Sequence, residues 1–327
     1  MRDSFAYDYD GGIPIPARIL DPTQPIEIEL TFEDHEGILW KYELLATEQR
    51  VIWEALYRKQ LKFNYVFKRS WNSESEFYEI TQQGFDLAAS ESRKVRENAS
   101  LISTALQYNS DAVNFISDFV INSNVQIFGR PHYSTNLIYA STYFHEFDDE
   151  RKDAVKLLQR WDIGLEDIVI EEVPNELSGK KKSSLITTFR HRRADGTVFS
   201  LPISQESNGT QSAFVLLAML KPVLEYGGAA IIDEMESDLH PNLLEPLLAL
   251  FDSERSNPNR AQLIFTSHTT KVMDFLGKSQ VYFVEKNDCI SQAYRGDQIK
   301  GLRSDDNLRA KYESGALGGL PQVVPNA

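Results

Sequence analysis

The chain has 327 residues, 42% of them hydrophobic and 25% charged, which is the balance of an ordinary globular protein. This balance excludes a disordered or collagen-like chain, and the length is enough for one large domain with two lobes or for two domains. The formal net charge of −14 argues against a whole-surface attraction to nucleic acid or to an anionic membrane, whereas short basic stretches leave local nucleic-acid binding open.

The cellular compartment is indicated by the cysteine content and by the shortness of the apolar runs. The one cysteine, Cys289, excludes an intrachain disulfide, which suits a reducing cytosol. A run such as Ala213–Leu220 is much shorter than the roughly 20 residues of a membrane helix, and Met1–Phe5 lacks the apolar region of a secretory signal. We therefore expect a soluble, cytoplasmic protein without a membrane segment.

Residues 1–86 have the pattern of a β-rich lobe. Pro25–Phe32 and Ile38–Leu45 alternate apolar with polar residues on either side of a turn-forming cluster, which predicts a β-hairpin. Two further strand-like stretches, Val51–Tyr57 and Tyr65–Arg69, predict that the hairpin continues as an antiparallel meander.

Residues 87–163 are predicted to form an inserted helical segment, because the apolar period changes from about Leu87 onward. The residues that recur at helical spacing are Val95, Ala99, Ile102, Ala105, Leu106, Val113, Ile116 and Val120. Asp149–Trp161 is a further expected helix, which should stop near Gly164.

Residues 164–327 alternate between strands and helices. The expected strands are Ile168–Glu172, Leu185–His191, Val198–Pro202, Ala229–Ile232, Gln262–Thr266 and Gln280–Glu285. The expected helices are Gln211–Glu225, Pro241–Asp252 and Lys271–Leu276. Short apolar strands separated by helices are typical of a largely parallel sheet with helices packed on it. The predicted fold class is therefore α/β, with an antiparallel β lobe and an inserted helical segment beside the α/β core.

The acidic pair Asp233-Glu234 closes the strand Ala229–Ile232, and ligands of parallel α/β sheets lie beyond the carboxyl ends of the strands. One carboxylate, that of Asp233, can hold a Mg²⁺ ion through water. Its neighbour Glu234 can orient and polarise an attacking water. For the dipeptide alone, an acidic N-cap of the following helix stays an equal alternative.

Three other motifs have a functional and a plain explanation. Ser207–Thr210 opens a helix with a Gly-containing turn, which is either an anion site or a simple capping turn. His268, after the strand Gln262–Thr266, can donate to a γ-phosphate oxygen, although a lone strand-end histidine is more often packed or in contact with solvent. Asp238 in Ser237–His240 is ambiguous in the same way, and a proline at the first helical position explains the adjacent His240-Pro241.

In this order and spacing the motifs resemble those of the ABC-type ATPase superfamily, which has a P-loop NTPase core. The resemblance implies a signature turn that contacts ATP held by a partner protomer, formed by Ser207, Asn208, Gly209 and Thr210. It implies that Ile231–Glu234 is the Walker B strand, that Ser237–His240 is the D-loop with Asp238 at the nucleotide, and that His268 is the switch residue. It also implies ATP and Mg²⁺ as cofactors, with Asp233 on the metal and with Glu234 and His268 in catalysis.

A narrower resemblance extends from about Gly12 to Pro321. The stretches Val95–Ala99, Gln262–His268, Val281–Lys286 and Leu317–Pro321 are similar to a bacterial family of stand-alone AAA/ABC-like ATPases related to OLD (overcoming lysogenization defect) proteins. Asn208 is the departure from that family's usual Ser-Ser/Gly-Gly-Thr signature. Members include ATPase partners in restriction-linked and anti-phage loci, some encoded beside a Toprim-type nuclease. The resemblance therefore implies a phage-defence or restriction-linked role, a homo-oligomer, and a separate nuclease as a candidate partner.

The phosphate-gripping loop G-x-x-x-x-G-K-[ST] is missing from this sequence. Gly179-Lys180 and Gly277-Lys278-Ser279 both lack the first glycine of that loop. In the resembled family the loop lies near the N-terminus, and Met1–Asp8 resembles the tail of the helix that follows it. We expect that an N-terminal piece is lacking, through a misassigned start or a truncated gene, and that the chain alone binds ATP poorly.

Three functions remain open from the sequence. The first is an ATP-driven switch, a head-to-tail dimer that closes around two ATP molecules and opens on hydrolysis. The second is a regulatory or scaffold subunit without hydrolysis, which the missing loop favours. The third is a metal-dependent nuclease suggested by Glu285, Asp288, Asp305 and Asp306, although scattered carboxylates are usually surface charge.

Overall fold

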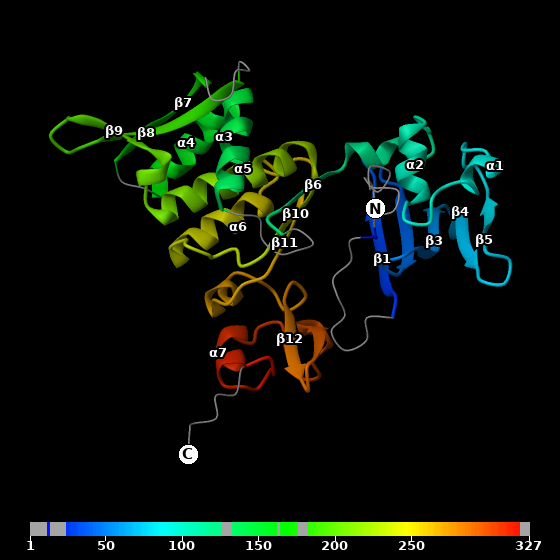
Figure 1. The fold of residues 1–327 in the computed structure, drawn as a ribbon. Coiled ribbons are helices and arrows are strands. Elements are labelled where there is room, and N and C mark those ends of the chain that lie inside the picture. The colour runs from blue at the N-terminus through cyan, green and yellow to red at the C-terminus, as the bar shows by residue number, and fades with distance from the viewer. Residues whose placement is uncertain (1–11, 14–23, 126–132, 162–163, 176–181, 321–327) are drawn as a thin grey trace. The chain divides into compact units, whose positions relative to one another are not determined.

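The computed structural model describes residues 12–13, 24–125, 133–161, 164–175 and 182–320 (Figure 1). Met1–Asp8 and the pair Gly179-Lys180 lie outside the described residues. The chain separates into two compact units. The first comprises the described residues up to Phe119, and the second comprises Val120–Val125 and the described residues from 133 onward. The interval 87–163, predicted as one helical segment, is thus divided between the two units.

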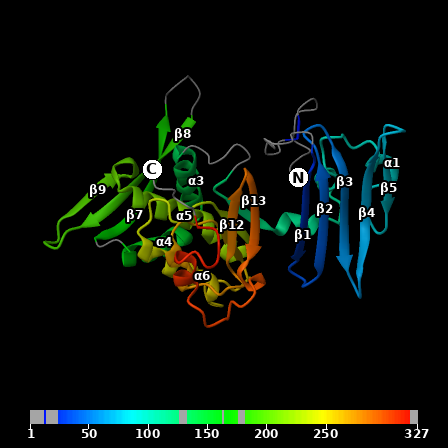
Figure 2. The same cartoon turned by 90° about the horizontal axis from the view of Figure 1, so that it is seen from below.

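The first unit is built on a five-stranded antiparallel sheet in the order β1-β2-β3-β4-β5, drawn side by side in Figure 2. Its strands are β1 (Ile26–Glu33), β2 (Leu39–Ala46), β3 (Val51–Lys59), β4 (Phe63–Asn72) and β5 (Phe77–Gln82). The predicted hairpin is confirmed, with Ile26 opposite Ala46 and Glu33 opposite Leu39. Asp34 stabilises the turn between β1 and β2, because its carboxylate accepts the N–H of Ile38 at 2.9 Å and the indole N–H of Trp40 at 2.7 Å.

The helices of the first unit are shorter than the apolar period predicts. They are α1 (Ala89–Ser92), α2 (Leu101–Gln107) and the 3₁₀ turn η2 (Asn114–Asp118). Helix α2 begins at Leu101 because the hydroxyl of Ser100 caps it, accepting the N–H of Ser103 at 2.9 Å. Residues 95–99 form turns instead of a helix, since their carbonyl groups bond to a side chain of the sheet.

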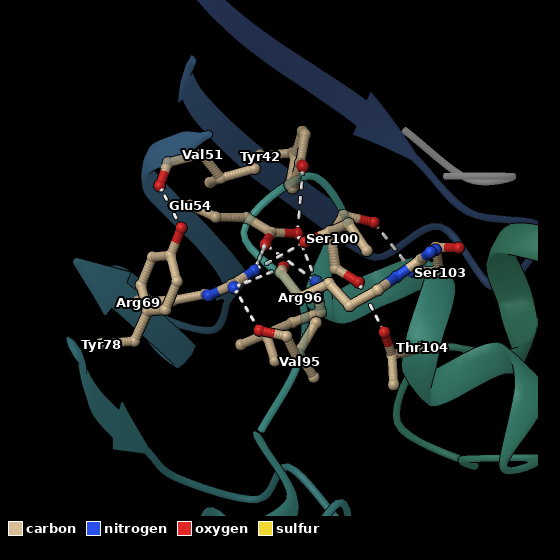
Figure 3. Close-up of polar contacts among 12 residues, drawn as sticks. Tyr42, Val51, Glu54, Arg69, Tyr78, Val95, Arg96, Ser100, Ser103 and Thr104 are labelled. Atoms are coloured by element: carbon tan, nitrogen blue, oxygen red, sulfur yellow. Dashed lines mark hydrogen bonds and ion pairs between the residues drawn. The ribbon is translucent and has the colours of Figure 1, made fainter. Parts of the chain in front are cut away.

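That side chain is Arg69 of β4, which is fully buried together with Glu54 of β3 (Figure 3). The guanidinium donates to the carbonyl oxygens of Val95, Arg96 and Ala99 at 2.7–2.9 Å. Its Nη1 lies 3.7 Å from the Glu54 carboxylate, which also accepts the N–H of Leu101 at 2.8 Å. Burial raises the pKa of Glu54, and the charge of Arg69 opposes that shift. The pair therefore ties the 95–101 segment to the sheet, and every donor near the carboxylate supports its charged form.

The second unit contains a three-stranded parallel sheet in the order β11-β10-β6. Its strands are β6 (Val120–Ser123), β10 (Gly228–Ile232) and β11 (Gln262–Phe265). The prediction that Val120 continues a helix is wrong, because its backbone pairs with Gly228. Gly228 has φ 113°, and a Cβ there would lie 2.0 Å from the carbonyl oxygen of Val120, so this close approach needs glycine.

Helix α5 (Asn208–Tyr226) packs on this sheet and is buried along most of its length. Helices α3 (Tyr133–Glu146) and α4 (Asp148–Trp161) pack against it, and α6 (Leu244–Asp252), preceded by the 3₁₀ turn η4 (Pro241–Leu243), adds Leu244 and Leu247 to the same apolar cluster. The predicted helix–strand–helix–strand run from Gln211 to Thr266 is therefore confirmed.

The expectation of one largely parallel sheet is wrong for the remaining strands. β7 (Leu165–Asn175), β8 (Lys182–Arg192) and β9 (Val198–Pro202) form a separate antiparallel sheet, and β12 (Tyr282–Asn287) pairs with β13 (Ile290–Arg295) as a hairpin. The physical reason is the length of the connections, since six residues or fewer separate these strands in the sequence and a parallel crossover needs about a dozen or more. The expected helix at 271–276 is the 3₁₀ turn η5 (Thr270–Asp274), and the short elements η3 (Ile203–Gln205), η6 (Gly296–Gln298) and α7 (Leu308–Glu313) complete the unit.

The fold class is α/β, as predicted: a helix-covered parallel core and a separate antiparallel β unit. In the described part of the chain, no helix combines the length and the apolar character needed to cross a bilayer.

The buried pair yields a stability prediction. Arg69→Met removes the positive charge beside the buried Glu54 carboxylate and the donor to three carbonyl oxygens, so we expect a loss of about 3–5 kcal/mol in the free energy of unfolding, measured by urea denaturation. The double variant Arg69→Met/Glu54→Gln should lose clearly less than the sum of the two single losses, because no buried charge is left. Additive losses would show that the two side chains do not act as a pair.

Candidate functional site

The parallel pairing of β10 and β11 brings two sequence motifs to one edge of the sheet. Ile232 lies opposite Phe265, so Asp233-Glu234 and Thr266–His268 leave the sheet side by side. The Nε2 atom of His268 lies 3.4 Å from Oε1 of Glu234. The histidine side chain is 84% exposed and the glutamate side chain 40%, so both are open to a ligand from solvent.

Glu234 is held in an uncommon backbone conformation. Its φ is 47°, in the left-handed region that a non-glycine residue adopts at a cost of roughly 1–2 kcal/mol per residue. The turn is closed by the N–H of Met235, which donates to the carbonyl of Thr266 at 3.1 Å, and by burial of the Met235 side chain. The hydroxyl of Ser237 donates to Oε2 of Glu234 at 3.0 Å, which leaves Oε1 directed to His268. Strain of this kind is often found where a side chain must be aimed at a ligand.

The hydroxyl of Thr266 joins the two acidic residues. It donates to Oδ1 of Asp233 at 2.6 Å and accepts the N–H of Glu234 at 2.8 Å. Sequence reasoning treated Thr266 as the last residue of a strand and did not single it out. The signal that could have identified Thr266 is its position directly after Phe265, the residue that pairs with the last residue of β10.

Asn124, just beyond β6, clamps the backbone of Asp233 from the other side. Its amide oxygen accepts the Asp233 N–H at 2.7 Å, and its amide nitrogen donates to the Asp233 carbonyl at 2.9 Å. Sequence reasoning missed this residue because it assigned the whole interval 87–163, which includes Asn124, to a helical segment. Nothing in the spacing of residues 120–125 marks Asn124 as a partner of a residue 109 positions away.

The backbone N–H of His268 is bonded to the carboxylate of Glu236. The other Glu236 oxygen is buried and has no hydrogen-bond partner within the described chain. Glu236 therefore fixes the peptide that carries the histidine, in addition to the contact made by Glu234.

Ser207–Thr210 forms the first turn of α5, as both sequence explanations require. The Ser207 hydroxyl caps the helix by accepting the N–H of Thr210 at 3.1 Å. Gly209 lies against the loop Ser237–His240 of the same chain, since a Cβ on it would come 3.1 Å from the carbonyl oxygen of Asp238. Asp238 itself has φ 61°, in the left-handed region like Glu234. The capping role is observed, and the turn and this loop, the segment expected to be the D-loop, are in contact.

A buried hydrogen-bonded pair fixes the residue that precedes the turn. Nε2 of His191, on β8, lies 2.7 Å from Oε1 of Glu206, and the two side chains are 11% and 5% exposed. The amide of Gln211 donates to the Glu206 carbonyl at 2.7 Å, and the ring of Phe199 stacks on His191. The antiparallel sheet β7–β9 thus anchors the start of α5, a connection that sequence reasoning did not identify.

Other predicted residues have structural partners. His240 caps η4, with Pro241 at its first position, as expected. Glu285 accepts hydrogen bonds from Tyr294 at 3.0 Å and from the N–H of Gly319 at 2.8 Å, and Asp306 pairs with Lys311. Across the described residues, no group of three or more His, Cys, Asp or Glu side chains could hold a metal ion.

The side chains present fit only part of a Mg·ATP site. Asp233 is a single carboxylate, which is what Mg²⁺ needs when waters and phosphate oxygens complete its shell. Glu234 and His268 add a base and a donor beside it. The missing part is the loop that binds the triphosphate, because the 327 residues contain no G-x-x-x-x-G-K-[ST] motif.

The contact of Gly209 with Asp238 yields a prediction. Gly→Ala in a helix ordinarily stabilises by about 0.5–1 kcal/mol. At Gly209 the new methyl group must push the D-loop backbone by a few tenths of an ångström. We therefore expect Gly209→Ala to unfold at the same or a lower urea concentration than wild type, with shifted amide resonances at 237–239. A gain of about 1 kcal/mol with an unchanged D-loop spectrum would contradict the contact.

Comparisons with known proteins identify a family for this chain. The family described as "AAA domain, putative AbiEii toxin, Type IV TA system" matches residues 11–274, which include every residue of the candidate site. None of the curated proteins matches the chain.

Two solved structures show distant likeness. One is the Smc head domain with a coiled coil and joint from Pyrococcus yayanosii, with 13% identity and a TM-score of 0.35 over 52% of this chain. This chain spans 30% of the length of that protein. The other is an SmcHead bound to the C-winged helix domain of ScpA, with 9% identity and a TM-score of 0.37 over 80% of this chain and 76% of the other. These two likenesses are too distant to add to the family match. On the match over residues 11–274, the chain belongs to the AAA-domain family that carries the AbiEii description.

Proposed function

We propose that residues 207–268 form the catalytic half of an ATPase site. The observation that supports this best is the 3.4 Å approach of His268 to Glu234, beside Asp233, at the carboxyl ends of two parallel strands. A sheet edge is where α/β proteins bind ligands. Membership in an AAA-domain family agrees with a nucleoside triphosphate as that ligand.

Each residue has a stated role in the proposal. Asp233, oriented by the Thr266 hydroxyl, holds a Mg²⁺ ion through water. Glu234 orients a water and accepts its proton, and its strained backbone keeps the carboxylate aimed outward. His268 donates a hydrogen bond to a phosphate oxygen. ATP supplies the phosphoanhydride bond, and Mg²⁺ supplies the charge that compensates it.

The second half of the proposal concerns assembly. Ser207, Asn208, Gly209, Thr210 and Asp238 would face the nucleotide of a second protomer in a head-to-tail dimer, which ATP closes and hydrolysis opens. The proposed setting is a cytoplasmic defence system against phage, or a restriction-linked one, with a separate nuclease as the candidate effector. The toxin–antitoxin description of the family is compatible with such a setting.

A second candidate is a regulatory or scaffold subunit that does not hydrolyse ATP. It is favoured by one feature of the sequence, the absence of a G-x-x-x-x-G-K-[ST] loop from these 327 residues. Without the lysine and N–H groups of such a loop, the β- and γ-phosphates lose their main charge compensation.

Calorimetric titration of the purified chain with Mg·ATP tests the ATPase candidate against the scaffold candidate. We expect weak, Mg-dependent binding that Asp233→Asn removes, and negligible phosphate release. Tight Mg-dependent binding by the unaltered chain would eliminate the scaffold candidate. Weak binding that is the same with and without Mg²⁺, and in Asp233→Asn, would count against the ATPase site.

The role of Glu234 is tested in a version extended at its N-terminus by a strand, a G-x-x-x-x-G-K-[ST] loop and a helix. Glu234→Gln should slow ATP hydrolysis by about 10²–10⁴-fold, the range for loss of a general base, and should accumulate a nucleotide-bound dimer in light scattering. Glu245→Gln, an exposed glutamate of α6, is the matched control and should hydrolyse at the parental rate. Unchanged turnover in Glu234→Gln would remove Glu234 from the reaction.

A further inference from the structure

One face of the first unit's sheet carries lysine and aromatic side chains together. We call it the β3–β4 face and define it by Tyr57, Lys59, Phe63, Tyr65 and Lys68. Residues of these strands that point the other way, such as Leu56 and Phe67, are fully buried in the core of the unit. Alternation therefore places the β3–β4 face on the side opposite the core.

The register gathers these side chains into a compact surface. Tyr57 lies opposite Tyr65, and Lys59 lies opposite Phe63. An irregularity in the pairing next to Leu56 leaves Val66 as an extra, buried residue in β4, so that Tyr65 and Lys68 fall on the same face although three positions separate them.

The cations lie over the rings. The Nζ of Lys68 is 4.8 Å from the centre of the Tyr65 ring and 5.7 Å from that of Tyr57. The Nζ of Lys59 is 4.9 Å from the centre of the Phe63 ring. Positive charge and aromatic rings thus lie at the same place, in cation–π contact with one another.

Within the described residues, the lysines of this face form no ion pair, and the carboxylate that accepts the Tyr57 hydroxyl at 3.0 Å, that of Glu43, is already paired with Lys41. Among the described residues, none of Lys59, Lys68 and the nearby turn residue Lys62 forms an ion pair, whereas Lys41 on the neighbouring strand is paired with Glu43 at 2.6 Å. In a protein of net charge −14, two such lysines on one face and a third in the adjoining turn are a local exception. Charge complementarity therefore favours a polyanion as the occupant.

We propose that the β3–β4 face binds single-stranded nucleic acid. Lys59, Lys62 and Lys68 contact phosphates, and Tyr65 and its neighbouring rings stack on unpaired bases. Lysines beside half-buried rings on the outer face of a sheet are a combination that can track a single strand without strong sequence preference. Duplex DNA fits less well, because its bases are already stacked and its phosphates alone would leave the rings unused. This function lies in the first unit and does not depend on the ATPase proposal.

The test is fluorescence anisotropy of the full chain with labelled oligo-dT and oligo-U of about 20 nucleotides, measured over a range of salt concentrations. The triple variant Lys59→Ala/Lys62→Ala/Lys68→Ala should lower the slope of log affinity against log salt by about 2, since each lost phosphate contact removes about 0.7. Tyr65→Leu should weaken binding roughly tenfold at fixed salt without changing that slope.

Lys94→Ala is the matched control, because Lys94 is an exposed lysine of the same unit that is paired with Glu91 at 2.9 Å. Its affinity should stay within about twofold of wild type. Thermal unfolding of each variant at the wild-type temperature shows that the unit remains folded, and Tyr65→Phe, which keeps the ring, should restore binding. Three results would overturn the proposal: no binding of either oligonucleotide at low salt, equal loss in Lys94→Ala and the triple variant, or wild-type affinity in Tyr65→Leu together with equal competition by inorganic polyphosphate.

Discussion

The parallel pairing of β10 with β11 is the interaction on which the candidate site depends. The ladder continues beyond the last paired residues, where the N–H of Thr266 donates to the carbonyl of Ile232 at 3.0 Å and the N–H of Met235 donates to that of Thr266 at 3.1 Å. These two bonds carry the register into the turn that holds Asp233 and Glu234. A slip of one residue would turn the Thr266 hydroxyl away from both carboxyl groups.

The two units hold their polar groups in place by different hydrogen bonds. In the second unit, an apolar helix and sheet support a polar edge, and short side chains such as Asn124 and Thr266 supply the hydrogen bonds that position it. In the first unit, the buried guanidinium of Arg69 donates hydrogen bonds to the carbonyl oxygens of Val95 and Ala99, which lie outside the helices. This unit leaves the opposite face of its sheet to lysine and aromatic side chains. Each unit thus combines a packed core with one polar surface, which is the sheet edge at Asp233 in the second unit and the β3–β4 face in the first.

Sequence patterns predicted the helices and strands that are determined mainly by residues close to one another in the chain. The hairpin of β1 and β2, helix α5, and strands β10 and β11 all have a clear period or turn signal. Strand β6 could not be predicted in this way, because four residues of mixed polarity form a strand only when β10 lies beside them. The antiparallel order of β7–β9 was missed since apolar strands look alike in either direction.

The same distinction applies to the site. Glu234 and His268 could be identified because their motifs stand at strand ends, and the structure brings them together. Asn124, Thr266 and the His191–Glu206 pair act through contacts between residues far apart in the chain. Their side chains are ordinary for the positions that they occupy, so only the three-dimensional structure reveals them as supports.

The most direct test of a shared site is a nuclear magnetic resonance titration with Mn²⁺ and a slowly hydrolysed ATP analogue, observed through the imidazole protons of the histidines. If Asp233 holds the metal beside Glu234 and His268, the His268 resonance broadens strongly. Asp233→Asn should then abolish the broadening. A His268 resonance that stays sharp at saturating metal and nucleotide, or one that broadens equally in Asp233→Asn, would contradict a common metal–nucleotide site at this edge of the sheet.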